Sequence, residues 1–335
     1  GNKALFAFTG SNATAVGSNA LLASVSDVGV TAVGHNALVS CNGGDYNTAV
    51  GKSALLTVDG NKNTAVGYAS LNADCGDDNT AIGNEALKAF TGGGATVVGK
   101  GAAIAAGSQG NLTAIGKQAM AAASSGEDNT GIGAYALDET IDGTNNTAVG
   151  VAALSADCVS DNTAVGRYAL LAFEGSNATA VGSGAADSAT SATNLTAVGK
   201  GALATTIDGH NNTAVGENAL GTGDCGNENT AVGREALKAF TGSSATAVGS
   251  NAADAAGAQV DLTAVGKSAL GSATAGNYNT AVGSYCLDHT ISGYQNTAIG
   301  ASSLSADCEN DNTSVGWMAL ANFTGSDATA IGSGA

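Results

Sequence analysis

The sequence predicts an all-β fold, a parallel β-solenoid built from coils of 16 or 17 residues. Two observations support this prediction: a short motif recurs along the whole chain, and the apolar content is mostly Ala and Val. Gly accounts for 50 of the 335 residues, Pro is absent, and aromatic residues make up only 4%. A globular domain of this length normally uses more large side chains in its core. A thin core of small side chains instead fits a repeat protein whose coils contact only their neighbours.

The recurring motif is a tetrad, Thr-x-(Val/Ile)-Gly, which occurs 20 times at spacings of 16 or 17 residues. A small residue stands six residues after each Thr, Ala in 17 copies, and Leu usually follows it. One coil therefore reads T-A-V-G-x-x-A-L, followed by eight or nine residues rich in Gly, Asp, Asn and Ser. Representative structural positions of the repeat are Thr14, Val16, Gly17, Thr147, Val149, Gly150, Thr230, Val232 and Gly233.

Two segments of each coil, Thr-Ala-Val and x-Ala-Leu, are predicted to form short strands separated by the constant Gly. A helix is excluded because Gly recurs in every unit and the apolar residues lack a 3,4 spacing. Equal coils stack in register about 4.8 Å apart, so 20 coils would give a rod of roughly 95 Å. The absence of Pro fits, because every coil must donate N–H groups to the next. The constant Gly predicts a positive φ or a close backbone approach.

Both predicted strands carry two consecutive apolar residues, Ala-Val and Ala-Leu. Side chains alternate along a strand, so one residue of each pair is expected to point outward. Repeated in every coil, these residues would form continuous apolar stripes, which monomeric proteins rarely expose. The sequence therefore predicts a homo-oligomer of chains packed side by side, without giving the number of chains.

The sequence also has a period that is several coils long. Equivalent Phe residues are spaced by 82, 83, 67 and 83 residues, which correspond to super-units of 5, 5, 4 and 5 coils: Phe8, Phe90, Phe173, Phe240 and Phe323.

Asn precedes the tetrad Thr in 11 copies and is expected to form amide ladders along the stack. Ala, Val or Leu replaces this Asn in the coils at and just after each Phe, where a different turn is expected. Residues 1–335 are predicted to be one continuous array, and we expect it to extend beyond both Gly1 and Ala335.

The repeat resembles two known groups of proteins. Its N-T-A-V-G core is similar to the N-S-V-A-I-G core of the head repeats of trimeric autotransporter adhesins. The longer N-T-A-V-G-x-x-A-L unit resembles arrays in bacterial and phage tail-fibre-like proteins. The resemblance implies a left-handed parallel β-roll, three chains around one axis and a surface location. The adhesin repeat is shorter and has Val where Thr stands here, and no adhesin neck, stalk or anchor is seen.

Four of the six cysteines are candidates for crosslinks: Cys75, Cys158, Cys225 and Cys308. Each ends an Asp-Cys pair in the coil before a Phe coil, so they stand four or five coils apart, roughly 19–24 Å. A disulfide needs Cα atoms within about 7 Å, which excludes bridges among these four in one chain. Crosslinks between chains or fibres are one interpretation, and a small thiol packed near the next Phe is the simpler one. Cys286 fills the Ala position and is predicted to lie in the core.

Acidic turn residues are weak candidates for Ca²⁺ ligands, because stacked loops could place their oxygens together. The G-G-x-G-x-D calcium repeat and the EF-hand loop are both absent, so a solvated, self-repelling surface is the favoured interpretation. No other metal or cofactor is expected. The candidates are Asp77, Asp78, Asp128, Asp157, Asp161 and Asp311.

Charge and residue distribution argue against several functions. The chain has 11 basic and 28 acidic residues and a net charge of −17, which does not suit binding to nucleic acid. No apolar run is long enough to insert this segment into a membrane. His35, His210 and His289 occupy unrelated coil positions, and no Ser/His/Asp or Cys/His arrangement stands out, so the chain is not expected to be an enzyme.

The predicted function is a structural shaft of an extracellular fibre or adhesin, located at the cell surface or on a virion. A phage tail-fibre shaft that presents a receptor-binding tip is one alternative. An ice- or Ca²⁺-binding solenoid is another, although ice-binding solenoids usually show T-x-T, whereas Val or Ile fills the second place here. The expected partners are further copies of the chain and a host-cell or surface receptor bound through other regions.

Overall fold

The computed structural model describes residues 1–335 and confirms the predicted parallel β-solenoid, in which no helix occurs. The chain divides into two compact units, Gly1–Thr163 and Ala164–Ala335, which we describe separately as unit 1 and unit 2. The division falls inside a tetrad, between Thr163 and Ala164, and no change in the repeat marks it.

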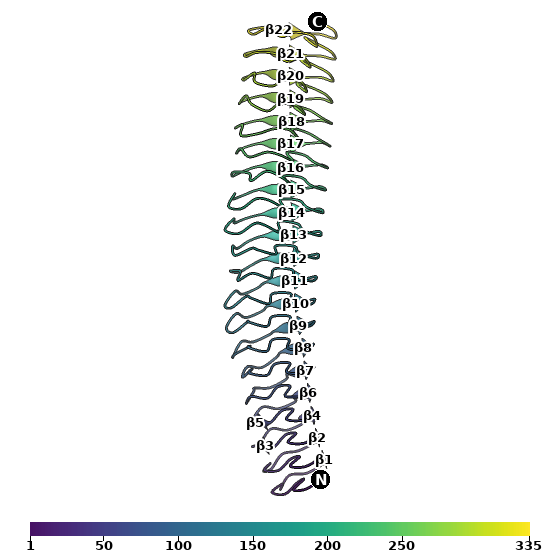
Figure 1. Ribbon diagram of the computed structural model, residues 1–335, viewed down its shortest axis with the longest axis vertical. Helices are drawn as coiled ribbons and strands as arrows, with labels where there is room; N and C mark the ends of the chain where they lie inside the picture. Colours follow the sequence, from purple (N-terminus) through teal and green to yellow (C-terminus); the bar gives the residue numbers. More distant parts are fainter. The chain divides into compact units, whose positions relative to one another are not determined.

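In unit 1 each tetrad forms one three-residue strand, and the strands stack parallel and in register (Figure 1). Thr14 pairs with Thr31, and Thr31 with Thr48, so equivalent residues form columns along the unit. The tetrad strands are β1 (Thr14–Val16), β2 (Thr31–Val33), β4 (Thr48–Val50), β6 (Thr64–Val66), β7 (Thr80–Ile82), β8 (Thr96–Val98), β9 (Thr113–Ile115), β10 (Thr130–Ile132) and β11 (Thr147–Val149).

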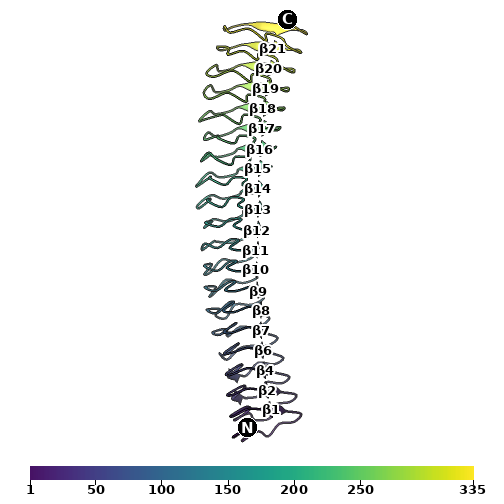
Figure 2. The same ribbon diagram turned by 45° about the vertical axis from the view of Figure 1, so that its right-hand side comes forward.

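Unit 2 repeats the same stack, and Figure 2 shows its strands from a second side. Thr213 pairs with Thr230, and Thr230 with Thr246. Strand β12 (Thr163–Val165) begins on the last residue of unit 1. The remaining strands are β13 (Thr179–Val181), β14 (Thr196–Val198), β15 (Thr213–Val215), β16 (Thr230–Val232), β17 (Thr246–Val248), β18 (Thr263–Val265), β19 (Thr280–Val282), β20 (Thr297–Ile299), β21 (Thr313–Val315) and β22 (Thr329–Ile331).

The predicted second strand, x-Ala-Leu, does not form, and that prediction is wrong. The segment is a turn in which alternate residues have positive φ, as Tyr135 (φ 60°) and Leu137 (φ 53°) show. The turn still bonds coil to coil, because the N–H of Leu137 donates to the carbonyl oxygen of Ala153 at 3.1 Å. A short second strand occurs elsewhere in two coils only, where β3 (Ser40–Cys41) pairs with β5 (Thr57–Val58).

This left-handed turn also corrects the prediction of two outward apolar stripes. Ala136 and Leu137 are consecutive, yet both are fully buried, because the turn does not alternate its side chains as a strand would. The left-handed conformation of a non-Gly residue costs about 1–2 kcal/mol. Burying the Leu side chain contributes about 1.5–3 kcal/mol, which offsets that cost. Only the tetrad alternates, with Ala231 buried and Val232 facing outward, so each unit has one outward apolar stripe.

The constant Gly of the tetrad has both properties that the sequence predicts. Gly133 has a φ of 139°, a conformation that side-chain-bearing residues rarely adopt. A Cβ atom added to Gly133 would lie 2.2 Å from the carbonyl oxygen of Gly150 in the next coil. The backbones of successive coils therefore approach too closely at this column for any side chain.

The Phe super-period has a packing origin. Phe90, Phe173 and Phe240 are fully buried inside the loop that follows the left-handed turn. The ring of Phe90 lies against Gly92, where an added Cβ would be 2.7 Å from Cζ of Phe90. Ala95 stands five residues after Phe90, at the position that Asn fills in most coils. A small residue there leaves interior volume for the ring, which explains why Asn and Phe exclude each other.

Candidate functional site

Buried Asn side chains connect neighbouring coils at the position before the tetrad Thr, which confirms the predicted amide ladder. In unit 1, Oδ1 of Asn47 accepts from the N–H of Asn63 at 2.8 Å, and Oδ1 of Asn63 accepts from the N–H of Asn79 at 2.9 Å. Nδ2 of Asn79 donates to the carbonyl oxygens of Gly76 and Gly92, both at 3.1 Å. Each Asn therefore closes its own loop and bonds to the next coil.

Unit 2 contains the same ladder. Oδ1 of Asn212 accepts from the N–H of Asn229 at 2.8 Å, and Oδ1 of Asn229 accepts from the N–H of Ala245 at 3.0 Å. The ladder therefore continues one step into a coil that has Ala instead of Asn. These buried amides are structural, because their oxygens and nitrogens are used within the stack.

The Asp-Cys pairs have a structural role that the sequence did not reveal. Oδ1 of Asp157 accepts from the N–H of Ile141 in the preceding coil at 2.8 Å. The adjacent Cys158 points inward, and its Sγ lies 3.3 Å from Oγ1 of Thr140. In unit 2, Asp224 accepts from Ile207 at 2.9 Å in the same way. The pair therefore caps a loop with its carboxylate and fills the interior with its thiol.

All six cysteines are buried and free, including the four crosslink candidates Cys75, Cys158, Cys225 and Cys308. Burial raises the pKa of the Cys75 thiol to about 12 and moves the pKa of Cys158, Cys225 and Cys308 in the same direction. These thiols are therefore protonated at neutral pH and poor nucleophiles. A crosslink to another chain would require a loop to open, so the geometry favours the packed-thiol interpretation. Cys286 lies fully buried at the Ala position, as predicted.

The six acidic candidates lie in the loops, where most of them bond to the preceding coil. Asp77 accepts from the N–H of Asn61 at 2.7 Å, and Asp157 caps Ile141 as described above. Asp128 and Asp161 accept from the side-chain amides of Asn111 and Asn145, at 3.0 and 3.1 Å.

The other two acidic candidates, Asp78 and Asp311, occupy the position two residues before the tetrad Thr, where the backbone has a positive φ. The structure contains no group of three or more His, Cys, Asp or Glu side chains that could hold a metal ion.

The three histidines lie in separate coils. Nδ1 of His210 lies 3.1 Å from both the backbone nitrogen and the hydroxyl oxygen of Thr193, so this ring connects two neighbouring coils. Nδ1 of His289 lies 3.0 Å from Oδ1 of Asp288 at the surface, and His35 is exposed. The structure does not place any of them beside a Ser or Cys in a nucleophile–base arrangement.

The outward face of the tetrad strands is the most regular surface of each unit. It presents one column of Thr and one column of Val or Ile, and it carries no charge. Val232 and Val248 on adjacent strands are 36% and 39% exposed. The Thr hydroxyls on this face form no hydrogen bond within the structure. This uncharged stripe is the candidate contact surface that the repeat itself provides.

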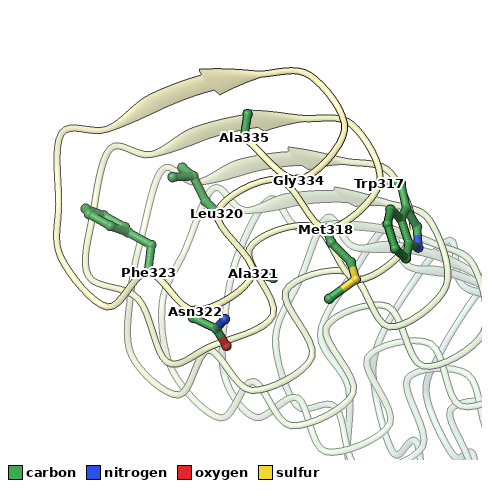
Figure 3. Close-up of a pocket in the computed structure, with 8 residues that line it drawn as sticks. All are labelled: Trp317, Met318, Leu320, Ala321, Asn322, Phe323, Gly334 and Ala335. Carbon is green, nitrogen blue, oxygen red and sulfur yellow. The ribbon is translucent and has the colours of Figure 1, made fainter.

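A cavity of about 480 Å³ lies at the last coil of unit 2 (Figure 3). Trp317 and Met318, which are 60% and 40% exposed, stand on one side of it, and Phe323 lies on the other. No acidic, basic or nucleophilic side chain lines it, so it offers apolar contact and no catalytic group: Trp317, Met318, Leu320, Ala321, Asn322, Phe323, Gly334 and Ala335.

No family model matches the sequence, and a search of curated proteins finds no similar chain. Among the structure's elements there is no helix with the length and apolar character needed to cross a bilayer.

The distribution of charge within the coil is a feature that sequence reasoning missed. Nine of the 11 Lys and Arg residues stand four to eight residues after a tetrad Thr, where only seven of the 28 acidic residues lie. The basic side chains therefore gather on one edge of the coils, and most acidic side chains belong to the remaining loop. Counting charges by position in the aligned repeat, instead of summing them, would have shown this separation.

Proposed function

We propose that the chain is a non-enzymatic structural shaft of an extracellular fibre or adhesin that provides stiffness and reach. The observation that supports this proposal is the uniformity of both units. Within each unit, backbone hydrogen bonds join successive coils, and buried Asn side chains or loop carboxylates add bonds in many of them. In such a stack, stability adds from neighbour to neighbour, so the number of coils sets the length.

A phage tail-fibre shaft would use the same mechanics and is the main alternative. A secretion or anchoring domain in the same protein would favour a cell-surface fibre, whereas a virion-attachment domain would favour a tail fibre. In either case we propose that a receptor is bound through other regions. The unpaired Thr hydroxyls on a flat, uncharged face favour a third candidate, ice binding, which a thermal-hysteresis measurement tests directly.

Removing one whole super-unit from unit 2 should shorten the protein without unfolding it. Deletion of residues 174–240 joins Phe173 to Thr241, so Phe173 takes the place of its equivalent, Phe240. Four coils are lost, and the maximum dimension is expected to fall by about 19 Å. Small-angle scattering measures this length, and thermal unfolding should remain cooperative.

The control is a deletion of residues 174–232, which removes a fractional number of coils. It puts a tetrad strand opposite a loop and should abolish the ordered stack. A super-unit deletion that leaves the length unchanged, or that aggregates as the control does, would contradict the proposal that coil number sets reach.

We propose further that the Val/Ile stripe mediates homo-oligomerisation, for which the resemblance to adhesin heads implies three chains. Changing both Val232 and Val248 to Asp places two charges on this stripe in adjacent coils. These side chains are partly exposed in a single chain, so the fold should survive, whereas desolvating the new charges between chains is costly. Sedimentation equilibrium should show the mass falling towards that of one chain.

Changing Ser183 and Ser250 to Asp adds the same charge on a different edge of unit 2 and serves as the control. The control variant should keep the wild-type mass. A wild-type protein that sediments as a single chain would refute the oligomer, and an unchanged mass in the Val variant would refute this stripe as the interface.

A further inference from the structure

One column of side chains in unit 2 lies at the fourth residue after each tetrad Thr. Backbone hydrogen bonds fix this column coil by coil, because the residue after each member donates to the carbonyl oxygen of the previous member. Asn218 donates to Lys200 at 2.9 Å, Glu235 to Glu217 at 2.9 Å, and Asn251 to Arg234 at 2.9 Å. Successive members are therefore one strand spacing apart, about 4.8 Å. We call this column the T+4 column.

Cations occupy every second position of the T+4 column over seven coils. They are Arg167, Lys200, Arg234 and Lys267, in the coils of β12, β14, β16 and β18. The positions between them are Ser183, Glu217 and Ser250. The cationic groups therefore recur every two coils, at about 9.6 Å. Unit 1 lacks this alternation, because its T+4 cations Lys52, Lys100 and Lys117 lie in the coils of β4, β8 and β9.

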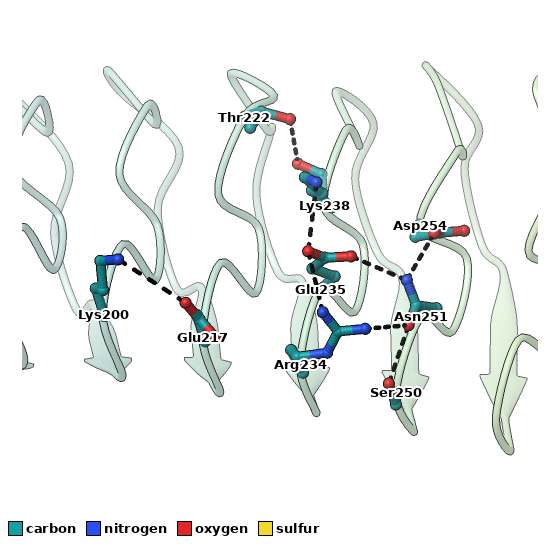
Figure 4. Close-up of polar contacts among 9 residues, drawn as sticks. All are labelled: Lys200, Glu217, Thr222, Arg234, Glu235, Lys238, Ser250, Asn251 and Asp254. Atoms are coloured by element: carbon teal, nitrogen blue, oxygen red, sulfur yellow. Dashed lines mark hydrogen bonds and ion pairs between the residues drawn. The ribbon is translucent and has the colours of Figure 1, made fainter.

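The cations of the T+4 column are exposed and only partly neutralised. The side chain of Lys200 is 75% exposed and reaches Glu217 at 4.0 Å, and that of Arg234 is 57% exposed and lies 3.5 Å from Glu235 (Figure 4). Glu235 also pairs with Lys238 at 3.5 Å, so two cations share one carboxylate. Exposed pairs of this kind contribute little to stability, which leaves the cations free to exchange partners.

Aromatic rings flank both ends of this set of cations. The guanidinium of Arg167 lies 4.1 Å from the ring centre of Tyr168, and Nζ of Lys267 lies 5.3 Å from that of Tyr285. Tyr285 is 41% exposed. A ring beside a cation offers an apolar face and a charge to the same ligand.

We propose that the T+4 column of unit 2 binds a linear acidic polysaccharide that carries one anionic group per disaccharide. An extended disaccharide has about the length of two coils, so successive carboxylates or sulfates can meet successive cations. The Tyr rings would contact sugar faces. This proposal concerns a surface of unit 2 and does not depend on the role of the chain as a shaft.

Duplex DNA fits this column poorly. It carries one charge per about 1.7 Å of its axis, so a cation every 9.6 Å or so neutralises little of it. The 21 acidic residues outside the basic edge would also repel such a dense polyanion. A thin glycan chain with widely spaced charges avoids both costs.

The test measures binding of the full chain to hyaluronate, which has one carboxylate per disaccharide, by biolayer interferometry at several salt concentrations. Arg167, Lys200, Arg234 and Lys267 are all changed to Ser, the residue that already occupies this column in other coils. Affinity should fall by roughly tenfold or more, because four exposed ion pairs are lost together. Circular dichroism checks that the variant remains folded.

A variant with scrambled spacing separates periodicity from charge. Ser183→Lys with Lys200→Ser, combined with Ser250→Lys and Lys267→Ser, keeps four cations but puts them on adjacent pairs of coils. It should lose hyaluronate binding nearly as completely as the Ser variant. Wild-type protein that binds hyaluronate no better than neutral dextran would overturn the proposal. Equal binding by the scrambled variant, or tighter binding to duplex DNA, would overturn it too, because either result indicates unspecific attraction.

Discussion

Replacing Gly99 with Ala is expected to destabilise unit 1 by more than about 3 kcal/mol. Gly99 has a φ of 147°, and an added Cβ would lie 2.1 Å from the carbonyl oxygen of Gly116. Backbone strain at such a position costs about 1–3 kcal/mol, and forcing a methyl group between two packed backbones costs about the same again. Denaturant unfolding and hydrogen exchange of the amides in β8 and β9 would measure the loss.

Gly110→Ala, in the same coil, is the matched control. No atom lies within 4 Å of the Cβ that this change adds, and its φ is not in the left-handed region. Stability should therefore change by less than about 0.5 kcal/mol or rise slightly, because Ala restricts the unfolded chain. Similar losses in both variants would show that coil contact at the tetrad Gly is not the cause.

Replacing Asn79 with Ala is expected to cost about 1–3 kcal/mol. The change removes the acceptor of the buried Ala95 N–H, which has no other partner. The carbonyl oxygens of Gly76 and Gly92 lose one donor but keep Nδ2 of Asn63 and the N–H of Gly76, respectively, so the unsatisfied Ala95 N–H dominates the cost. Ala itself fits, since Ala95 fills the equivalent position one coil on. The free energy of unfolding by denaturant measures the cost.

Two companion variants sharpen this experiment. Asn84→Ala changes an exposed Asn on the next turn of the same region, whose side chain forms no hydrogen bond, and should be nearly neutral. Asn79→Asp keeps the acceptor for Ala95 but turns a carboxylate towards the carbonyl oxygens of Gly76 and Gly92, so it should destabilise the protein more than Asn79→Ala does at neutral pH. Stability equal to wild type in Asn79→Ala would exclude the ladder as a stabilising element.

The tetrad could be predicted from the sequence because its local preferences and its burial agree. Thr and Val favour a strand, and alternate side chains of the strand face opposite sides, as observed for Ala231 and Val232. The turn at Leu137 could not be predicted, because nothing in a Leu side chain signals a left-handed backbone. Its conformation is imposed by burial and by bonds to the next coil, which are tertiary effects.

Among the polar positions, too, some roles could be predicted from the sequence and others could not. The Asn ladder was predictable, since an amide that recurs at one coil position faces its own copies. The sequence makes the carboxylate of Asp157 a candidate metal ligand, whereas in the structure it caps the N–H of Ile141. Loop geometry, which the sequence does not specify, decides between these roles. The alternating cations of the T+4 column do not show in the net charge, because that sum discards the position of each charge in the coil.

The Asn ladder is directional, because each side-chain oxygen accepts from the coil that follows it in sequence and never from the one before. The same side chain also donates to a carbonyl oxygen of the following coil, as Nδ2 of Asn79 does to Gly92. The two faces of a coil are therefore chemically unlike, one presenting side-chain amides and the other backbone N–H and C=O groups. A newly synthesised coil meets a template that already displays both an acceptor and a donor for its backbone. A duplicated block can join the array in one orientation only, since the reverse would set Asn side chains against Asn side chains and leave the backbone groups without these partners. Such an array has a defined polarity, and duplication of a block of coils can lengthen it through the coil-to-coil interface that already exists.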